Sequence, residues 1–553
     1  MRGPRALISY ACGVFACLTS GQAAAQSAVP NPDPVTVPAG AASAPETFDI
    51  QAFDVSGVTK LAAGEVERLV YPHAGPGRTK DDVEAARKAL QDAYAAKGFE
   101  AVVVDVPIQA TDTFNQGIVQ IAVSEVPVGR VRVTNSRYHA LSVARAQIAS
   151  LAEGKPVDFK ALQADISAAN RFPDRTIAPE FKPGKVPGTL DVDLKIDDQR
   201  PLHASVQIDN DNSPQTSPLR VTATARYTNL FQAGQTASLT YVVAPQRRKD
   251  TEVVAGSYTV PIMGSRWTVA LSGYYSNSNI AALGSSNVLG KGYQFSLRAI
   301  YRLPSDKTVQ TLSFGPDYKD FKQNIFVSGT QTSDAPIRYV PLNVQYAIAG
   351  ASERSSYAIS LAATFGLRLF NRVVCADAAT VCIPVDQFQN REQNSLENFV
   401  HLNLSANYDL AFKNDFVAST KFSGQLADSH LITNEQFSAG GFQSVRGYYS
   451  AESVGDQGVT GGLELRSPSF SRLLGKWLTE ARFYGFADGA YIHVIDTSVG
   501  QTANFKLVGV GGGLRLRILD MLSGDVLVAV PLIAGPVSKR GDPRFNFVVR
   551  GEF

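Results

Sequence analysis

The sequence predicts an α+β N-terminal region followed by a transmembrane antiparallel β-barrel of about 16 strands. After about residue 200, apolar and polar residues alternate with period two, as in 293–303 and 401–410. Before this point the periodicity is partly helical, and the chain begins with the pattern of an export signal. A strand with one apolar and one polar face suits a wall between lipid and a wet lumen.

The N-terminus is expected to be a secretory signal peptide over residues 1–25. Arg2 and Arg5 precede an apolar stretch, and small residues at 23–25 offer a cleavage site. The apolar stretch is too short for a membrane-spanning helix. A lipoprotein signal through Cys17 is the alternative, which Phe15 fits poorly.

Residues 26–45 are expected to form a linker rich in proline and alanine. The prolines are Pro30, Pro32, Pro34, Pro38 and Pro45. Such a density excludes a continuous helix over this segment.

A first small α/β unit is expected over residues 46–126. It begins with a short strand and a short helix. A stronger helix starts at Thr79, where Thr79 and Asp82 have capping-box spacing, and ends at Gly98. Strands at 101–107 and 117–124 complete the order β-α-α-β-β.

A second unit is expected over residues 127–199 in the same order. Helices are expected at 141–151 and from Phe159 to Ala169, with closing strands near 177–181 and 190–196. A duplicated unit of this size can bury its own small core.

Residues 200–553 are expected to form the barrel. They leave room for about sixteen strands, if each takes about ten residues plus a connection. The expected strands begin near residues 203, 219, 235, 251, 266, 292, 308, 337, 355, 397, 416, 458, 481, 506, 524 and 544. The last one carries an apolar face that ends at Phe553, which we expect to act as an assembly signal.

The composition disfavours several classes of protein. The formal net charge is +2 and 18% of residues are charged, which fits neither a nucleic-acid binder nor a disordered chain. Removal of the signal peptide would leave Cys375 and Cys382 in a polar stretch between strands. In an oxidising compartment these two favour a small disulfide loop over free thiols.

No catalytic residue, cofactor or metal site is expected. The six histidines are scattered without ligand spacing, and no phosphate-binding loop with Gly-Lys is present. The run Gly509-Val510-Gly511-Gly512-Gly513 superficially suggests a dinucleotide turn. Because it lies in a predicted strand with no helix after it, small residues on a lumen wall are the better interpretation.

One motif indicates a family. Residues 442–449 read Phe-Gln-Ser-Val-Arg-Gly-Tyr-Tyr, late in the predicted barrel and behind two β-α-α-β-β units. This combination resembles the TpsB translocators of two-partner secretion, the haemolysin-activator-like members of the POTRA-plus-barrel superfamily. Further landmarks agree in order along the chain: Pro107-Ile108-Gln109, Asn170-Arg171-Phe172-Pro173, Pro183-Gly184, Asp209-Asn210, Gly455-Asp456-Gln457-Gly458 and Glu464-Leu465.

The resemblance implies a contact inside the barrel. In this family the loop that holds Val445, Arg446, Gly447 and Tyr448 folds back into the lumen. Its arginine is expected to meet an aspartate of a Phe-x-Asp-x-Gly motif on a neighbouring strand. Here the motif begins Phe486-Ala487-Asp488, and Gly489 stands one place before the expected glycine, which is Ala490.

A planar guanidinium suits two-point binding of a carboxylate. We therefore expect an Arg446–Asp488 pair that holds the loop in its secretion-competent position. The alternative is a surface arginine in an ordinary loop. Many relatives also carry a helical plug before the first POTRA unit; the prolines of 26–45 lead us to expect none here, or an altered one.

The resemblance implies a pore in the cell outer membrane, with its POTRA units in the periplasm. Such a pore captures an unfolded exoprotein and secretes it. The implied partners are a secreted TpsA-like client that is expected to be β-helical, outer-membrane lipid, periplasmic chaperones and the barrel-assembly machinery, but no nucleic acid. The POTRA sheets could add a client strand at a free edge, with the second unit delivering it to the barrel. An outer-membrane insertase of the same superfamily and a passive porin or surface receptor are the alternatives.

Overall fold

The computed structural model describes residues 47–553, except 279, 284, 285, 290, 306, 323, 328, 329, 371, 372, 376–383, 476, 498 and 499. The expected signal peptide, linker and altered plug lie outside the described residues. The chain divides into two compact units, one ending at Arg200 and the other running from Pro201 to Phe553. Each is described by itself.

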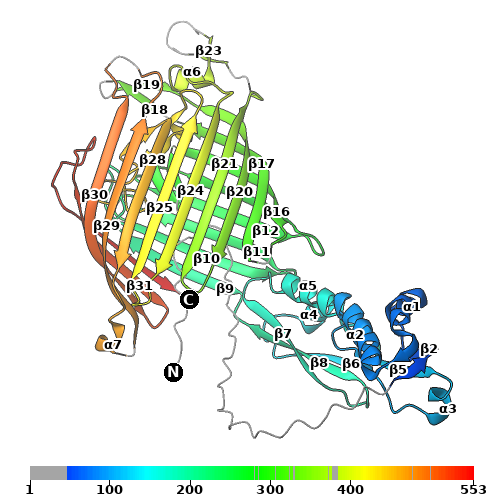
Figure 1. The fold of residues 1–553 in the computed structure, drawn as a ribbon. Coiled ribbons are helices and arrows are strands. Elements are labelled where there is room, and N and C mark those ends of the chain that lie inside the picture. Colours follow the sequence, from blue (N-terminus) through cyan, green and yellow to red (C-terminus); the bar gives the residue numbers. More distant parts are fainter. Residues whose placement is uncertain are drawn as a thin grey trace. The chain divides into compact units, whose positions relative to one another are not determined.

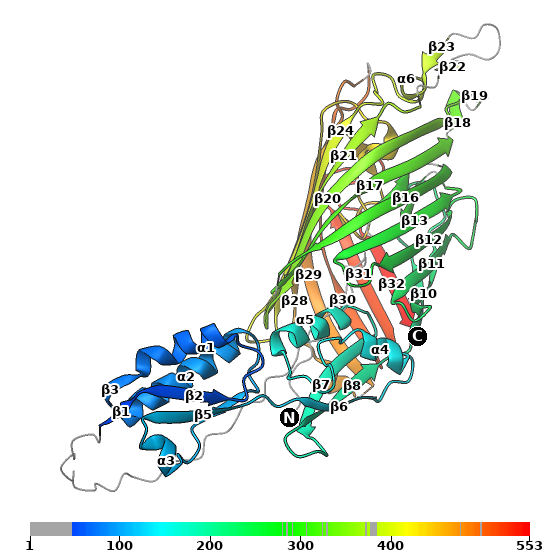
Figure 2. The ribbon, with the colours of Figure 1, turned by 90° about the vertical axis from the view of Figure 1, so that its right-hand side faces the viewer.

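The N-terminal unit begins with a three-stranded sheet of order β2-β5-β4. β2 (Ala52–Ser56) and β5 (Ile118–Ser124) are parallel, and β4 (Val103–Asp105) is antiparallel to β5. Helices α1 (Ala63–Val70) and α2 (Lys80–Ala96) lie on one face of this sheet (Figure 2). Their apolar stripes form one core with β5, centred on Leu90, Tyr94 and Ile121.

Local signals determine where α2 begins. The Asp82 carboxylate accepts hydrogen bonds from the backbone N–H of Thr79 at 2.9 Å and from its hydroxyl at 3.0 Å. This satisfies a donor that a helix start leaves open. Smaller elements complete this part: β1 (Phe48–Ile50) pairs with β3 (Gly75–Arg78), and η1 (Tyr71–His73) and α3 (Thr111–Phe114) are short helices.

The second sheet has the order β6-β8-β7. Its strands are β6 (Val128–Thr134), β7 (Arg175–Pro183) and β8 (Leu190–Asp198). Helices α4 (Leu141–Ala146) and α5 (Phe159–Ala169) pack on it around Ile148, Leu162 and Leu194. The expected helix over 141–151 is therefore shorter in the structure. In the described residues, no helix is long and apolar enough to cross a membrane.

The second compact unit is a closed barrel of sixteen strands (Figure 1), which confirms the predicted fold class. Each strand pairs antiparallel with its neighbours, and β32 closes the barrel against β9. The strands are β9 (Leu202–Asp209), β10 (Arg220–Leu230), β11 (Gln235–Val243), β12 (Glu252–Pro261), β13 (Trp267–Ser276), β16 (Lys291–Leu303), β17 (Thr308–Lys322), β20 (Ile337–Ala351), β21 (Ser355–Leu367), β24 (Val400–Ala411), β25 (Val417–Ala427), β28 (Gln457–Arg466), β29 (Leu478–His493), β30 (Asn504–Ile518), β31 (Leu522–Pro531) and β32 (Arg544–Glu552).

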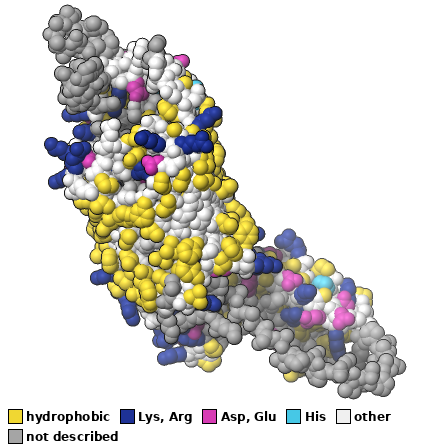
Figure 3. Space-filling model, turned by 90° about the vertical axis from the view of Figure 1, so that its left-hand side faces the viewer, with side chains coloured by type: hydrophobic (Ala, Val, Ile, Leu, Met, Phe, Trp, Pro, Cys, Tyr) yellow, Lys and Arg dark blue, Asp and Glu magenta, His cyan; other side chains and the backbone are white. Residues whose placement is uncertain are grey.

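The outside of the barrel is apolar. Leu297, Leu361 and Phe545 are exposed on it, whereas their polar strand neighbours point inward. Figure 3 shows hydrophobic side chains gathered in a band over the wall. This band is the surface that a bilayer would cover.

The two ends of the barrel differ. Short turns such as 231–234 lie at the end where β9 begins, and long connections lie at the other end. The long connections carry the hairpins β14 (Ile280–Leu283) with β15 (Ser286–Leu289), β18 (Asn324–Val327) with β19 (Thr330–Asp334), and β22 (Val373–Cys375) with β23 (Pro384–Asp386). In outer-membrane barrels the long loops are extracellular.

Candidate functional site: a loop anchored to the inner barrel wall

The connection between β25 and β28, residues 428–456, is the candidate site, and we name it the inner loop. It contains η2 (Thr433–Glu435), β26 (Phe437–Ala439) and β27 (Ser453–Gly455), the two strands being paired. Val445 is 0% exposed and Tyr448 is 1% exposed. A connection this buried packs inside the molecule instead of extending into solvent.

Strand β29 supplies the wall that faces the inner loop. Phe483 and Tyr491 are exposed on the outside, whereas Phe486 and Asp488 are buried. Since successive side chains of a strand point to opposite faces, the even-numbered residues here point into the lumen. Gly489 therefore belongs to the outer face, and the structure does not bring it to the inner loop.

Arg446 of the inner loop binds the wall at several points. Its Nε lies 2.7 Å from Asp488 Oδ2 and its Nη2 2.9 Å from Asp488 Oδ1, a two-point contact. Its backbone N–H also donates to Asp488 Oδ2 at 3.1 Å. The remaining arm, Nη1, lies 2.6 Å from Glu464 Oε2 on β28. The guanidinium carbon lies 3.6 Å from the centre of the Phe486 ring, a cation–π distance.

Two glycines allow this close approach. Gly447 has a φ of +99°, which favours glycine over any other residue. Gly509 on β30 lies under the Arg446 backbone, and a Cβ there would stand 2.0 Å from the Arg446 carbonyl oxygen. The glycine run that begins at Gly509 lies in strand β30 of the barrel wall and not in a turn before a helix. This agrees with the interpretation from the sequence.

Val445 and Tyr448 anchor the same segment. The Tyr448 hydroxyl lies 2.7 Å from the Ile533 carbonyl oxygen and accepts from the Val508 N–H at 3.1 Å. Val445 packs with Ile492 and Leu507 in a small apolar cluster. Ala490, which stands at the expected glycine position, packs against this cluster too, so the inner loop accommodates its methyl group.

The polar network extends beyond the residues predicted as the lock. Glu464 Oε1 also lies 2.8 Å from Arg466 Nε and 3.4 Å from Arg515 Nη1. Lys421 Nζ is 4.0 Å from Asp488 Oδ1. The sequence marked Glu464 only as a landmark, because nothing local showed that it shares the arginine.

Other carboxylates fix the rest of the inner loop. Glu435 is buried, and its Oε1 lies 2.5 Å from Lys319 Nζ. Asp456 Oδ2 lies 2.8 Å from His430 Nδ1 and accepts from the Ile495 N–H at 2.7 Å. Glu452 accepts from the Ser538 N–H at 2.7 Å. The inner loop is thus tied to the wall along its length.

A second connection, residues 368–399, packs on the inner loop at the long-loop end, and we name it the outer loop. Its helix α6 (Gln387–Arg391) buries Phe388 in a cluster with Tyr339 and with Leu431 and Ile432 of the inner loop. The rings of Phe388 and Tyr339 meet edge to face at 5.4 Å. The Thr433 hydroxyl donates to the carboxylate of Glu392, a direct bond between the two loops.

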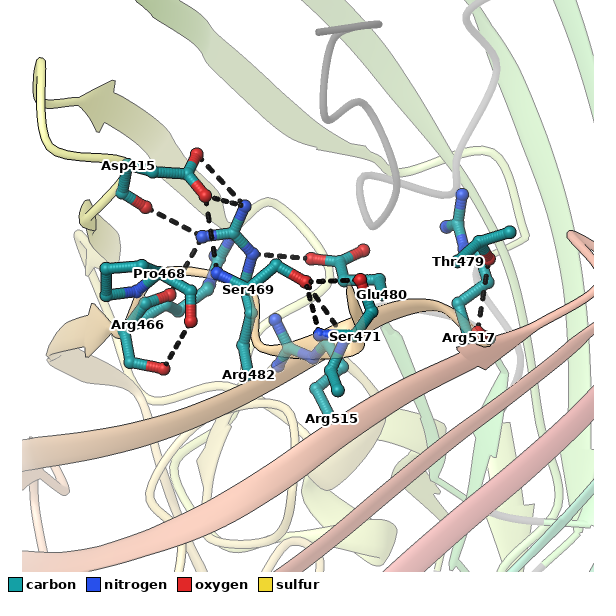
Figure 4. Close-up of polar contacts among 12 residues, drawn as sticks. Asp415, Arg466, Pro468, Ser469, Ser471, Thr479, Glu480, Arg482, Arg515 and Arg517 are labelled. Atoms are coloured by element: carbon teal, nitrogen blue, oxygen red, sulfur yellow. Dashed lines mark hydrogen bonds and ion pairs between the residues drawn. The ribbon is translucent and has the colours of Figure 1, made fainter. Parts of the chain in front are cut away.

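A separate polar cluster lies at the short-turn end of the wall (Figure 4). Arg482 of β29 donates to the Asp415 carbonyl oxygen at 2.7 Å and to the Ser467 carbonyl oxygen at 2.8 Å. Its Nε lies 2.9 Å from Glu480 Oε1. This arginine joins two neighbouring turns, one of which leads into α7 (Ser471–Leu474).

Of the described residues, the remaining ones predicted from the sequence do not contact Arg446 or Asp488. Phe553 exchanges backbone hydrogen bonds with Ala204 of β9 at 2.8 and 3.0 Å, and its ring is exposed. Cys375 ends β22, and Cys382 lies outside the described residues, so the disulfide stays a prediction. Within the described part of the chain, no three His, Cys, Asp or Glu residues are grouped to hold a metal ion.

Comparison with known families gives two matches. The family described as haemolysin secretion/activation protein ShlB/FhaC/HecB matches residues 188–516. The family described as POTRA domain, ShlB-type, matches residues 48–125.

Among curated proteins, the heme/hemopexin transporter protein HuxB of Haemophilus influenzae is 21% identical over 86% of this chain and 81% of its own. The outer membrane transporter CdiB of Escherichia coli is 22% identical over 33% of this chain and 30% of its own.

Among solved structures, CdiB from Escherichia coli covers 94% of this chain and 93% of its own at 18% identity, with a TM-score of 0.63. CdiB from Acinetobacter baumannii covers 93% and 91% at 14% identity, with a TM-score of 0.57. At these identities the structures show a shared fold.

Proposed function

The chain belongs to the haemolysin secretion/activation protein family ShlB/FhaC/HecB, and from this premise we propose how it captures and passes its exoprotein. It is an outer-membrane translocator of two-partner secretion, with POTRA domains in the periplasm and a secreted TpsA-type exoprotein as partner. The observation that carries the proposal is the two-point contact of Arg446 with Asp488.

The Arg446–Asp488 pair holds the inner loop in the position that permits secretion. Both groups are almost fully buried, at 5% and 3% exposure, so removal of either leaves a charge without its partner in a poorly solvated place. Two-point geometry adds orientation to the attraction, since it fixes the guanidinium plane. The pair would then hold the inner loop against the wall in one orientation.

A charge exchange tests this lock. Arg446→Asp and Asp488→Arg should each abolish most secretion, and the double exchange should restore a measurable part of it. The measurement is exoprotein in the medium at equal amounts of folded barrel. Arg226→Gln, which removes an exposed charge from β10 and leaves the pair and its neighbours Glu464 and Arg466 unchanged, is the matched control. Equal defects in the single and double variants would contradict the lock.

The client binds first at a free sheet edge of a POTRA unit. In the first unit the β4 edge is occupied, because the Gln91 amide bonds the Val102 carbonyl at 2.7 Å and the Val104 N–H at 2.9 Å. In the second unit Asn170 bonds both backbone groups of Ile177 on β7, at 2.7 and 3.0 Å. On β6 the first residues are occupied too, because the Val128 N–H donates to the Lys155 carbonyl at 2.9 Å and the Val131 N–H donates to Glu153 at 2.9 Å. Capture is therefore proposed at β2 and at the last residues of β6, 132–134, with β6 delivering the client.

Cysteine cross-linking tests whether the client binds at the free sheet edges or at the occupied ones. Asp54→Cys on β2 and Thr134→Cys on β6 should form disulfides with cysteines in the N-terminal segment of the exoprotein. Val103→Cys on β4 and Ala178→Cys on β7 are the matched controls on the occupied edges. Cross-links that favour the controls would contradict edge capture at β2 and β6.

Gene deletion separates secretion from the insertase and porin alternatives. Loss of one large exoprotein from the medium is the expected result. General loss of outer-membrane barrels, or a change confined to solute uptake, would contradict the function proposed for this chain.

A further inference from the structure

A patch of cations stands on the outer wall at the extracellular ends of three neighbouring strands. Lys291 begins β16, Lys322 ends β17 and Arg338 lies at the start of β20. All three are exposed. Lys291 continues the outward row of Phe295 and Leu297 on its strand, so it points away from the lumen. We name these three residues the rim patch.

The strand register places the two lysines face to face. Lys291 and Lys322 are direct partners across the β16–β17 pair. Like charges directly opposite on one face of a sheet are destabilising. In the described part of the chain neither ammonium group has an acidic partner within ion-pair distance. The arrangement therefore favours an anion that both can reach.

The carboxylate nearby is already engaged. Asp320 Oδ2 lies 2.8 Å from Arg338 Nη2, and the Tyr293 hydroxyl lies 3.2 Å from the same oxygen. The rim patch with Asp320 thus has three cations and one carboxylate. By comparison, Arg248 in the connection between β11 and β12 forms an ion pair with Glu252 at the start of β12.

The position identifies the class of anion. Tyr293 and Tyr318, whose rings stack at 6.1 Å, lie just below the patch at the level where aromatic side chains meet the headgroups. Below them the outward rows of β16 and β17 are apolar, with Leu297, Leu312 and Phe314 exposed. A ligand that matches both the cations above and the apolar rows below has a phosphorylated headgroup and acyl chains.

We propose that the rim patch binds the headgroup phosphates of an outer-leaflet lipid. Lys291 and Lys322 share one phosphate, and Arg338 orients the headgroup beside them. The acyl chains lie along the apolar rows below. Such a lipid would relieve the repulsion between the lysines and hold these strand ends together. This site is independent of the inner loop and of the exoprotein.

The test compares lipid binding to two double variants of the full-length protein in detergent. Lys291→Gln with Lys322→Gln removes the paired lysines. Arg354→Gln with Lys413→Gln removes two exposed charges from adjacent turns at the opposite end, where the Arg354 carbonyl accepts from the Ala411 N–H, and is the matched control. The probes are bisphosphorylated lipid A and its dephosphorylated form with the same acyl chains, counted as bound adducts by native mass spectrometry.

Wild type and the control variant should bind bisphosphorylated lipid A alike, and the lysine variant roughly 10- to 30-fold more weakly. Wild type should bind the dephosphorylated form as weakly as the lysine variant does. Equal binding of both lipids to wild type, an equal loss in both double variants, or no loss in the lysine variant would each overturn the proposal. Full displacement of the lipid by millimolar inorganic phosphate would overturn it in favour of a free-phosphate site. Unchanged mobility of the unheated barrel on a gel verifies folding.

Discussion

At the scale of single residues, Arg446 shows how ion pairs and hydrogen bonds offset the cost of burying a charged side chain. Each of its three nitrogens has a carboxylate oxygen within hydrogen-bond distance, and its plane rests on Phe486. Burying an unpaired guanidinium would cost several kcal/mol, and one carboxylate would leave an arm unsatisfied. Asp488 and Glu464 together therefore satisfy all three guanidinium nitrogens of Arg446 in the buried position of the inner loop.

The packing under Arg446 can be tested without changing any charge. Gly509→Ala would place a methyl group 2.0 Å from the Arg446 carbonyl oxygen, a contact that the backbone must relieve by moving. We expect secretion to fall at least severalfold. Gly489→Ala on the outer face of β29 meets nothing nearer than 3.8 Å and should secrete like wild type. Similar secretion by both variants would show that the inner loop does not depend on this contact.

A second residue-scale prediction concerns the pH dependence of the second POTRA unit. The Asp198 carboxylate accepts N–H bonds from Tyr138 at 2.8 Å and from Arg137 at 3.0 Å, and a Ser136 hydroxyl bond at 2.8 Å. Burial alone would raise the pKa of Asp198, but these bonds outweigh burial and lower it to about 2 from an ordinary 3.8. The stabilisation is therefore complete above about pH 4 and is lost as the pH falls towards 2.

Asp198→Asn should lower the free energy of unfolding of this unit by about 2 kcal/mol at pH 7. It should also flatten the dependence of that free energy on pH between 4 and 2. Urea unfolding followed by circular dichroism at 222 nm, to which the POTRA helices α2 and α5 contribute, measures both. Exposed Asp197, changed to Asn, is the matched control. A steep acid slope that persists in Asp198→Asn would assign the slope to other groups.

At the scale of elements, period-two patterning predicted the barrel strands well. The largest differences in starting residue are three positions, at β24 (397 expected, 400 observed) and β29 (481 expected, 478 observed). A lipid-facing row must be apolar at every second position, so the signal repeats along each strand. Helix α6 was not predicted, because its five residues are too few to show the spacing of apolar residues that marks a helix.

The candidate site was only partly predictable for a related reason. Arg446 and Asp488 belong to motifs, so a resemblance could pair them. Glu464, Lys421 and Gly509 contribute through strand register, which brings three different strands under one loop. No local pattern encodes that register, since it depends on how the closed barrel staggers its strands.

The packing of the outer loop on the inner loop gives an element-scale prediction. Glu392 and Thr433 are in direct contact through their side chains, so cysteines at both positions should be joined by a short reducible bis-methanethiosulfonate cross-linker that fixes the two loops together. If the exoprotein leaves past this contact, the cross-linked variant should stop secreting and recover with reductant. The background carries Cys375→Ser and Cys382→Ser, and each single cysteine is a control. Undiminished secretion by the cross-linked form would show that the contact stays closed during transport.

At the scale of the whole molecule, closure of the barrel depends on a short pairing. β32 and β9 are paired over Ser205–Asp209, whereas β30 and β29 are paired along nearly the whole of both strands. Beyond the end of β9, the Asn210 side chain continues the ladder. Its Oδ1 accepts from the Phe547 N–H at 2.9 Å, and its Nδ2 donates to the Phe545 carbonyl at 2.9 Å.

Asn210→Ala should therefore weaken closure of the whole barrel although it alters one side chain. Two lost hydrogen bonds are worth about 1–2 kcal/mol, and they lie where few others hold the strands. The temperature at which the compact barrel converts to the unfolded form on an unheated-gel assay should fall. Asn407→Ala, which shortens an exposed amide on β24, should leave it unchanged. If both variants convert at the wild-type temperature, the backbone pairs of β9 and β32, together with the bonds of Phe553 to Ala204, suffice to close the barrel.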